Sequence, residues 1–361
     1  MTAASRMSDL ALITGGAGFV ATNVADRLLR LGCRVRLFDN LSRAGVDQNV
    51  AWLEAEHPGR VELVVGDVRD AAALREAVRG TTRVFHFAAQ VAVTTSLGDP
   101  FLDFEVNARG TLNLLEALRG LAAPPSLLFT STHKVYGELE DVRLLARGRR
   151  YEPLDAELAA RGVGERRPLD FQSPYGCSKG AAEQYVLDYA RTFRLPATVF
   201  RMSCVYGPHQ FGTEDQGWVA HFLIQALQGR ALTVYGDGMQ VRDVLFVEDL
   251  VDAMLLAHDR IEDLAGRAFN IGGGPDHTVS LLELIALLGE MLGGRPAYAL
   301  EPWRPADQRY YVSNTGRFSA ATGWRQMTSV REGLKRLMNW LVEVNAARAP
   351  LLEIVGSRVA S

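Results

Sequence analysis

The chain has 361 residues, of which 48% are hydrophobic and 22% charged, and its formal net charge is −3. This apolar content can bury a full core, as expected of one large α/β domain with an appended lobe. The small net charge argues against nucleic acid or an anionic membrane surface as the main partner, and no apolar run reaches the ~18 residues of a membrane span. The N-terminus lacks a signal-peptide pattern, and the 3 cysteines and 7 histidines follow no disulfide or metal spacing. We therefore expect a cytoplasmic protein that binds no metal, no nucleic acid and no membrane.

Up to residue 206, short apolar runs alternate with helical patterns, which is typical of a parallel sheet with crossover helices. The predicted strands are 10–13, 34–38, 61–65, 84–87, 127–130 and 197–200, and the predicted helices include 19–31, 71–79 and 101–119. The fold class is therefore α/β: a Rossmann-type doubly wound parallel sheet with a smaller C-terminal α/β lobe that binds the substrate.

The segment 138–170 breaks this alternation with a cluster of arginines among acids and glycines. It can be a solvated surface loop, or a lid that contacts the substrate, because long loops in compact domains are usually functional or disordered. The arginines are Arg143, Arg147, Arg149, Arg150, Arg161, Arg166 and Arg167.

After Gly207 the composition changes to that of a smaller lobe. We predict helices at 217–228, 248–257 and 280–292 and strands at 231–235 and 242–246. The interpretation is a main domain over 1–206, to which 242–273 returns, and a smaller lobe over 207–241 and 274–361.

A glycine-rich turn follows the first predicted strand and begins the first helix. Its pattern is Gly15-x-x-Gly18-x-x-Ala21, with Phe19 and Val20 opening the helix. A dinucleotide fingerprint needs this context, because glycines allow the tight turn and the amides at a helix N-terminus can face a pyrophosphate. Alanine replaces the usual third glycine, which still permits close packing of helix on strand.

Polar residues after the next strands fit the rest of a dinucleotide. Asp39 ends the second strand, where a carboxylate would accept hydrogen bonds from the adenosine ribose and repel a 2′-phosphate, so we favour NAD over NADP. Arg43 leaves NADP as the weaker alternative. The other expected cofactor contacts are Asn40, Asp67, Val68, Ala88, Ala89 and Gln90.

A tyrosine and a lysine stand four residues apart at the start of an apolar-periodic segment. On a helix, Tyr175 and Lys179 would lie one turn apart on one face. An ammonium that close favours the phenolate, so we expect the pKa of Tyr175 to be lowered from about 10. Thr132, at the end of the fifth strand, can bind the reacting sugar oxygen beside this pair.

Together these motifs resemble the extended short-chain dehydrogenase/reductase family, the nucleotide-sugar epimerases and dehydratases, over nearly the full chain. The resemblance implies that Tyr175 is the acid/base, that Lys179 binds the nicotinamide ribose, and that Thr132 orients the substrate hydroxyl. Asn107 would hold the backbone and water near the site, and Arg43, Asn107, Tyr175 and Lys179 would complete the cofactor contacts. The residues that carry the resemblance are Gly15–Val20, Asp39, Asp67, Asn107, Thr132, Tyr175, Lys179 and Arg201-x-x-x-Val205-Tyr206-Gly207-Pro208.

Within the family, the chain is most similar to members that invert C2 of a CDP-linked deoxyhexose. The similar stretches are 38–43, 90–96, 134–140, 173–181, 215–219 and 240–245, and His133 stands where we expect asparagine. A 4-epimerase is the main alternative, and a non-catalytic NAD-binding regulatory protein is the alternative of another class. Dehydratases carry Asp-Glu after the threonine, whereas His133-Lys134 stands here, so dehydration is disfavoured.

The resemblance and the chemistry of phosphate together suggest the substrate contacts. Guanidinium groups bind phosphate in a fork, so Arg242 and Arg309 are candidates for the substrate pyrophosphate, and surface salt bridges are the alternative for both. The expected substrate-binding residues are Thr94, His133, Lys134, Arg201, Gln216, Trp218, Arg242 and Arg309. By analogy with relatives, we expect a homodimer or a dimer of dimers that packs helices 101–119 and 173–193.

Overall fold

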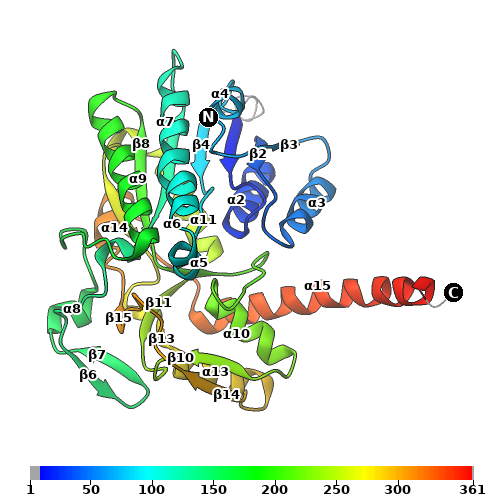
Figure 1. Ribbon diagram of the computed structural model, residues 1–361, viewed down its shortest axis with the longest axis vertical. Helices are drawn as coiled ribbons and strands as arrows, with labels where there is room; N and C mark the ends of the chain where they lie inside the picture. The colour runs from blue at the N-terminus through cyan, green and yellow to red at the C-terminus, as the bar shows by residue number, and fades with distance from the viewer. Residues whose placement is uncertain (1–8, 360–361) are drawn as a thin grey trace.

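The computed structural model describes residues 9–359 and confirms the predicted fold class (Figure 1). Its central sheet has seven strands in the order β12-β8-β5-β4-β1-β2-β3, and every neighbouring pair is parallel. The strands are β1 (Leu10–Thr14), β2 (Arg34–Asp39), β3 (Val61–Val65), β4 (Arg83–His86), β5 (Ser126–Thr132), β8 (Ala197–Met202) and β12 (Ala268–Ile271). In this register Thr14 lies opposite Phe38 on one side and His86 on the other.

Helices cover both faces of this sheet, each with its own apolar core. One core joins the sheet to α2 (Phe19–Arg30), α3 (Val46–Glu56), α11 (Val247–Asp259), α12 (Ile261–Leu264) and α14 (Gly316–Thr322). The other joins it to α4 (Ala71–Ala77), α7 (Gly110–Arg119) and α9 (Ser173–Thr192). Leu28 and Leu114, one from each core, are fully buried, as the helical spacing of apolar residues requires.

The predicted helix 101–119 is divided into three elements. It comprises α6 (Pro100–Phe104), a π-helical turn η1 (Glu105–Arg109) and α7. Asp99 caps α6 by accepting a hydrogen bond from Leu102 N at 2.9 Å. A short helix, α5 (Val93–Gly98), precedes it and packs against α9.

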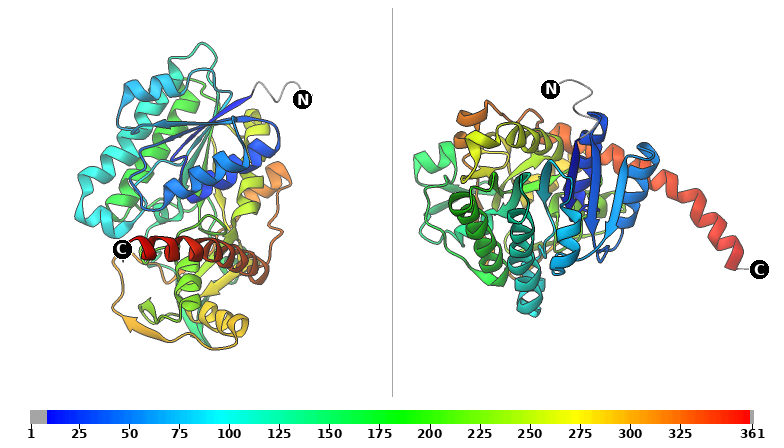
Figure 2. Two further views of the ribbon diagram at one scale, coloured as in Figure 1. Left: turned by 90° about the vertical axis from the view of Figure 1, so that its right-hand side faces the viewer. Right: turned by 90° about the horizontal axis from the view of Figure 1, so that it is seen from above.

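The C-terminal lobe lies below the carboxyl ends of the main strands (Figure 2). Its core packs α10 (Trp218–Leu227) and α13 (Leu281–Leu292) against β10 (Leu232–Tyr235), which pairs in parallel with β14 (Tyr298–Glu301). A second sheet places β11 (Val241–Phe246) between β13 (Thr278–Ser280) and β15 (Tyr310–Tyr311), and β11 also pairs with β9 (Cys204–Tyr206). The last helix, α15 (Val330–Val359), starts in the lobe core and projects away from the body.

The arginine-rich segment 138–170 is ordered and packs on the lobe. It forms a hairpin of β6 (Leu144–Arg147) and β7 (Arg150–Pro153), followed by α8 (Ala156–Arg161). Val163 N donates to Val312 O at 2.7 Å, and Arg150 Nη2 donates to Thr278 Oγ1 at 2.6 Å. The short 3-10 turns η2 (His133–Tyr136) and η3 (Pro275–His277) complete the elements. Among the helices described between residues 9 and 359, none has the length and hydropathy needed to cross a membrane.

Candidate functional site

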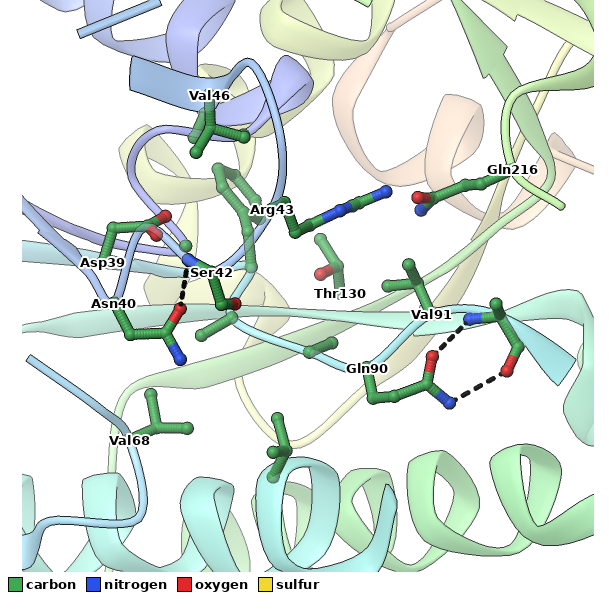
Figure 3. A pocket seen from close by; sticks show the side chains of 18 of the residues that line it. Asp39, Asn40, Ser42, Arg43, Val46, Val68, Gln90, Val91, Thr130 and Gln216 are labelled. Carbon is green, nitrogen blue, oxygen red and sulfur yellow. Dashed lines mark hydrogen bonds between the residues drawn. The ribbon is translucent and has the colours of Figure 1, made fainter. Parts of the chain in front are cut away.

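A cavity of about 670 Å³ opens at the carboxyl ends of the first five strands of the main sheet (Figure 3). This is the edge at which open α/β sheets bind ligands, and the volume lies in the usual range of about 300–1,000 Å³. Fourteen of the fifteen expected cofactor residues line it: Gly15, Gly18, Phe19, Val20, Asp39, Asn40, Arg43, Asp67, Val68, Ala88, Ala89, Gln90, Tyr175 and Lys179.

The β1–α2 turn has the shape that a pyrophosphate requires. Gly15 has φ +66°, and a Cβ on it would lie 2.7 Å from Ala88 N. Both the left-handed backbone conformation and the lack of space therefore require glycine at this position. Gly18 is the N-cap of α2 and offers no side-chain cap, so the first amides of the helix stay available to an anion. The residues present therefore fit NAD.

Asp39 is held by two backbone amides where β2 ends at this cavity. Its Oδ2 accepts from Ala17 N at 3.0 Å, and its Oδ1 accepts from Leu41 N at 2.8 Å. Asn40 Nδ2 donates to Asp67 Oδ2 at 3.0 Å, and Arg69 holds the pKa of Asp67 well below its usual range. Arg43 extends from the loop after β2 toward Gln216 on the far side of the cavity (Figure 3).

A second cavity of about 410 Å³ lies between the sheet and the lobe, and it shares part of its lining with the first. Tyr175, Ser131 and Gln216 line both cavities, whereas Lys179 lines only the first and Thr132 only the second. The phenol of Tyr175 therefore lies where the two cavities meet. Thr94, His133, Lys134, Trp218 and Arg242 also line the second cavity, as expected of substrate contacts.

The electrostatics of the Tyr–Lys pair differ from the expectation. Burial raises the pKa of Tyr175 to about 12, against an opposing hydrogen bond from Thr132, and burial lowers the pKa of Lys179 to about 7. The predicted lowering of the tyrosine pKa is therefore wrong for this arrangement, because burial outweighs the hydrogen bond from Thr132 and the charge of Asp103 raises the pKa further. Lys179 Nζ lies 4.3 Å from the centroid of the Phe129 ring.

Asn107 lies behind the first cavity and holds its wall. Its Oδ1 accepts from Gln90 N at 2.9 Å, and its Nδ2 donates to Gln90 O at 2.9 Å. This pair of hydrogen bonds to one backbone position fixes the segment after β4, in keeping with the backbone-holding role that the resemblance implies.

Two cations and an aspartate form a buried network on the wall of the second cavity. Arg242 Nη2 donates to Asp307 Oδ1 at 2.7 Å and to Gln308 O at 2.5 Å, and Lys134 Nζ donates to Ala306 O at 2.9 Å. Arg242 is thus committed largely to protein groups. The neighbouring His133 donates through Nδ1 to Met202 O at 3.1 Å, and burial lowers its pKa well below the usual value.

Two of the expected substrate residues lie outside both cavities. Arg201 is buried and ion-paired with Glu183, and its Nη1 donates to Tyr136 Oη at 2.8 Å, so it supports α9 from behind. Arg309 lies over the rings of Tyr151 and Trp303, at 5.9 and 5.5 Å from their centroids. The structure does not support direct substrate contact for either residue.

Arg304 also lines the second cavity, although it was not predicted from the sequence. Its guanidinium lies 3.9 Å from the centroid of the Tyr235 ring and 3.3 Å from Asp215 Oδ1. Its side chain is only 24% exposed, and solvent-facing carboxylates are its ion partners, so an incoming phosphate could replace them. Nothing in the local sequence around Trp303-Arg304-Pro305 distinguishes this arginine from Arg309, a few residues further along the chain.

The segment 138–170 does not line either cavity, although all of its residues are described. Most of its residues are exposed or partly exposed, as expected of a surface segment, but it forms a hairpin and a helix, and its backbone is bonded to the lobe at Tyr151 and Val163. Among the residues that the structure describes, no group of His, Cys, Asp and Glu is arranged to hold a metal ion.

A dinucleotide cavity that runs into a second cavity at a buried tyrosine, one turn before a buried lysine, defines a nicotinamide-dependent enzyme of the short-chain dehydrogenase/reductase class. Comparison with known proteins gives the family. The profile of the NAD dependent epimerase/dehydratase family matches residues 11–272, so the chain belongs to that family and uses NAD.

Relatives that match more than 90% of the chain include enzymes with different sugar substrates. CDP-paratose 2-epimerase of Salmonella typhi is 41% identical over 339 residues, which cover 91% of this chain and 98% of that protein. The structure of UDP-glucose 4-epimerase from Thermus thermophilus in complex with NAD matches with a TM-score of 0.77 at 33% identity, covering 92% and 98%. The dTDP-glucose 4,6-dehydratase DesIV of Streptomyces venezuelae, solved with NAD bound, matches with a TM-score of 0.79 at 28% identity, covering 95% and 99%.

Proposed function

We propose that the protein inverts C2 of a CDP-linked deoxyhexose, in the manner of a CDP-paratose 2-epimerase. The observation that carries the proposal is the 41% identity to that enzyme over 91% of this chain. The gathering of Thr132, Tyr175 and Lys179 around the junction of the two cavities supports it.

The residues of the site have distinct roles in a transient oxidation of the sugar. Tyr175 accepts the proton of the C2 hydroxyl, Thr132 hydrogen-bonds the reacting oxygen, and Lys179 stabilises the phenolate. When bound, NAD supplies a reversible hydride acceptor for the substrate carbon. The planar 2-keto sugar turns over within the second cavity and is reduced on its other face, when Tyr175 returns the proton to the oxygen.

The cofactor and the substrate are held by different walls. NAD is held by the glycine turn from Gly15 to Val20, by Asp39 on the adenosine ribose, and by Lys179 on the nicotinamide ribose. The substrate pyrophosphate is bound by Arg304, because this guanidinium is accessible, whereas Arg242 is held by Asp307. Gln216 and Trp218 flank the sugar nucleotide from the lobe.

A 4-epimerase is the second candidate, and the 33% identity to UDP-glucose 4-epimerase over 92% of the chain supports it. The same proton and hydride chemistry would serve either carbon, and the shape of the second cavity decides which hydroxyl meets Tyr175. Elimination of water is disfavoured, because His133 and Lys134 occupy the positions at which dehydratases carry an acidic pair.

Incubation of the enzyme with CDP-, UDP-, GDP- and dTDP-hexoses, followed by NMR, tests the proposal. We expect inversion at C2 of a CDP-sugar, and no deuterium on carbon when the reaction runs in heavy water. Inversion at C4 of a UDP-sugar would instead establish the second candidate, and absence of turnover with every sugar would support a non-catalytic NAD-binding protein.

Tyr175→Phe removes the proton-transfer group and keeps the ring. We expect a loss of turnover of at least about 100-fold, the range found for acid–base groups, with NAD still bound. NAD content is measured by release from the denatured protein, and undiminished turnover would contradict the role of Tyr175.

We further propose a cytoplasmic homodimer that packs α6–α7 and α9 of each copy together. Phe101 and Phe104 of α6 are 82% and 53% exposed, and Tyr185 and Phe193 on and next to α9 are 45% and 44% exposed, an apolar surface that a second copy would cover. No disulfide joins the described cysteines, which suits a reducing compartment. Sedimentation of the purified protein measures the oligomeric state.

A further inference from the structure

A buried carboxylate lies beneath the helix that carries Tyr175 and Lys179. Asp103, in α6, has no exposed surface and lines neither cavity. Its Oδ1 accepts from Gln90 Nε2 at 2.8 Å and from Asn107 Nδ2 at 3.1 Å, and its Oδ2 accepts from the hydroxyl of Ser178. Ser178 lies on α9, directly before Lys179.

Backbone groups fix the orientation of both amides that face Asp103. Gln90 Oε1 accepts from Ala92 N at 2.6 Å while its Nε2 donates to Ala92 O at 2.9 Å, and Asn107 Oδ1 accepts from Gln90 N at 2.9 Å. The amide nitrogens therefore have to point toward the carboxyl group. Oδ1 of Asp103 therefore only accepts, whereas Ser178 accepts from Asn107 Nδ2 and has one hydroxyl proton for two acceptors, Asp103 Oδ2 and Tyr175 O. Hydrogen bonding thus favours a carboxylate, although burial raises its pKa.

Lys179 follows Ser178 directly on α9 and is itself buried, and its positive charge lowers the pKa of Asp103. Lys179 in turn is influenced by two acids, Glu183 and Asp103. Glu183 already forms a buried ion pair with Arg201, so much of its charge is balanced. Asp103 makes its hydrogen bonds to neutral groups, and its negative charge is therefore the one left to balance the buried ammonium.

We propose that Asp103 is a positioning residue for the Tyr175–Lys179 pair: it ties Ser178 on α9 to the wall of the NAD cavity and keeps Lys179 charged. The proposal rests on the proposed function only in assigning this pair to catalysis. The other charged or titratable groups that act on Lys179 or are affected by its charge are Glu183 on α9 and His86 on β4. His86 stays neutral, since burial lowers its pKa to about 3.

The chain contains only three lysines, Lys134, Lys179 and Lys335. Incorporation of ¹³Cε-labelled lysine into the full chain therefore gives three NMR signals, which lysine-to-arginine variants assign. With saturating NAD, we expect Asp103→Asn to lower the titration midpoint of Lys179 by at least about one pH unit. This shift corresponds to a roughly tenfold larger acid dissociation constant of the ammonium group. Glu105→Gln, which removes a partly exposed acid from the same segment, is the matched control and should leave the midpoint unchanged.

An unchanged midpoint in Asp103→Asn would overturn the proposal, even if the variant is less stable, because a merely structural role lowers stability without altering the titration. Should this variant not fold, Asp103→Ser removes the same charge and leaves room for water. The titration midpoint of Lys179 in that variant then tests the proposal. The titration needs no substrate. Failure of the sugar panel would therefore refute the proposed function alone, and an unchanged midpoint in an active epimerase would refute the role of Asp103 alone.

Discussion

The buried side chain of Lys179 has an energetic cost that can be measured. Burial lowers its pKa from 10.5 to about 7, so the folded protein releases this proton at a pH at which the unfolded chain still holds it. Between those two values the unfolded state binds more protons, and stability must rise with pH. The positive charge that the proposed reaction requires thus weakens the fold near neutral pH.

Lys179→Met keeps the length of the side chain and removes the charge. We expect turnover to fall by about 100-fold or more, while the free energy of unfolding at pH 7 stays the same or increases, because a buried ammonium is no longer desolvated. Unfolding in denaturant between about pH 7 and 10 should lack the rise with pH that the parent shows. Lys335→Met, at an exposed site on α15, is the control, and an identical rise in both variants would contradict the prediction.

Individual residues were predictable from sequence where the chemistry is local. The glycine turn, Asp39 and the Tyr175–Lys179 pair are short motifs within single strand–loop–helix units, and all of them line the cavities. Arg201, Arg304 and Arg309 could not be distinguished, because tertiary partners decide which guanidinium meets solvent. The role of Asp103 could not be predicted from the sequence, because it depends on burial and on hydrogen bonds from Gln90, Asn107 and Ser178, which only the tertiary structure brings together.

Among the elements, the β1–α2 turn shows how closely backbone geometry constrains the cofactor site. Strands and helices with clear apolar spacing were predicted within a few residues. The helix α3 was missed, because its first turn is polar and it begins after Gly45 at φ +83°. The π-helical turn η1 was also missed, because its sequence continues the helical pattern of α6 and α7.

Gly15→Ala tests this turn against a control with the same backbone conformation. The added Cβ would lie 2.7 Å from Ala88 N, and this clash must displace the β1–α2 turn. We therefore expect the affinity for NAD to fall at least about tenfold. Gly59 has φ +73° and open space around it, so Gly59→Ala should cost only about 1 kcal/mol of stability and leave NAD binding unchanged. Calorimetric titration with NAD measures both, and equal affinities would contradict the assignment of the turn.

For the whole molecule, buried neutral histidines predict instability in acid. Burial lowers the pKa of His86 and His258 to about 3 and that of His209 to about 4. In the unfolded chain these rings bind protons near pH 6.5, so each one removes roughly 1.4 kcal/mol of stability per pH unit below that value. The raised pKa values of Asp103 and Asp243 act in the opposite direction as the pH falls.

We expect the melting temperature to fall between about pH 6.5 and 4, and His258→Gln to reduce the steepness of that fall. His258 Nδ1 lies 2.7 Å from Ser126 Oγ, and glutamine can keep this bond without titrating. His277→Gln, at a partly exposed ring, is the control that should leave the pH dependence unchanged. If the melting temperature falls equally steeply with pH in the parent and in both variants, the prediction is contradicted.

The seventh strand of the main sheet, β12, reaches its place only after the chain has passed through the lobe. β8 is paired with β5 on one side and with β12 on the other, so a chain that ends before Ala268 leaves the backbone groups of β8 unpaired on one side. Such an open edge invites pairing with other chains. The first 206 residues therefore lack one strand of the main sheet, and this strand becomes available only after most of the lobe has been synthesised.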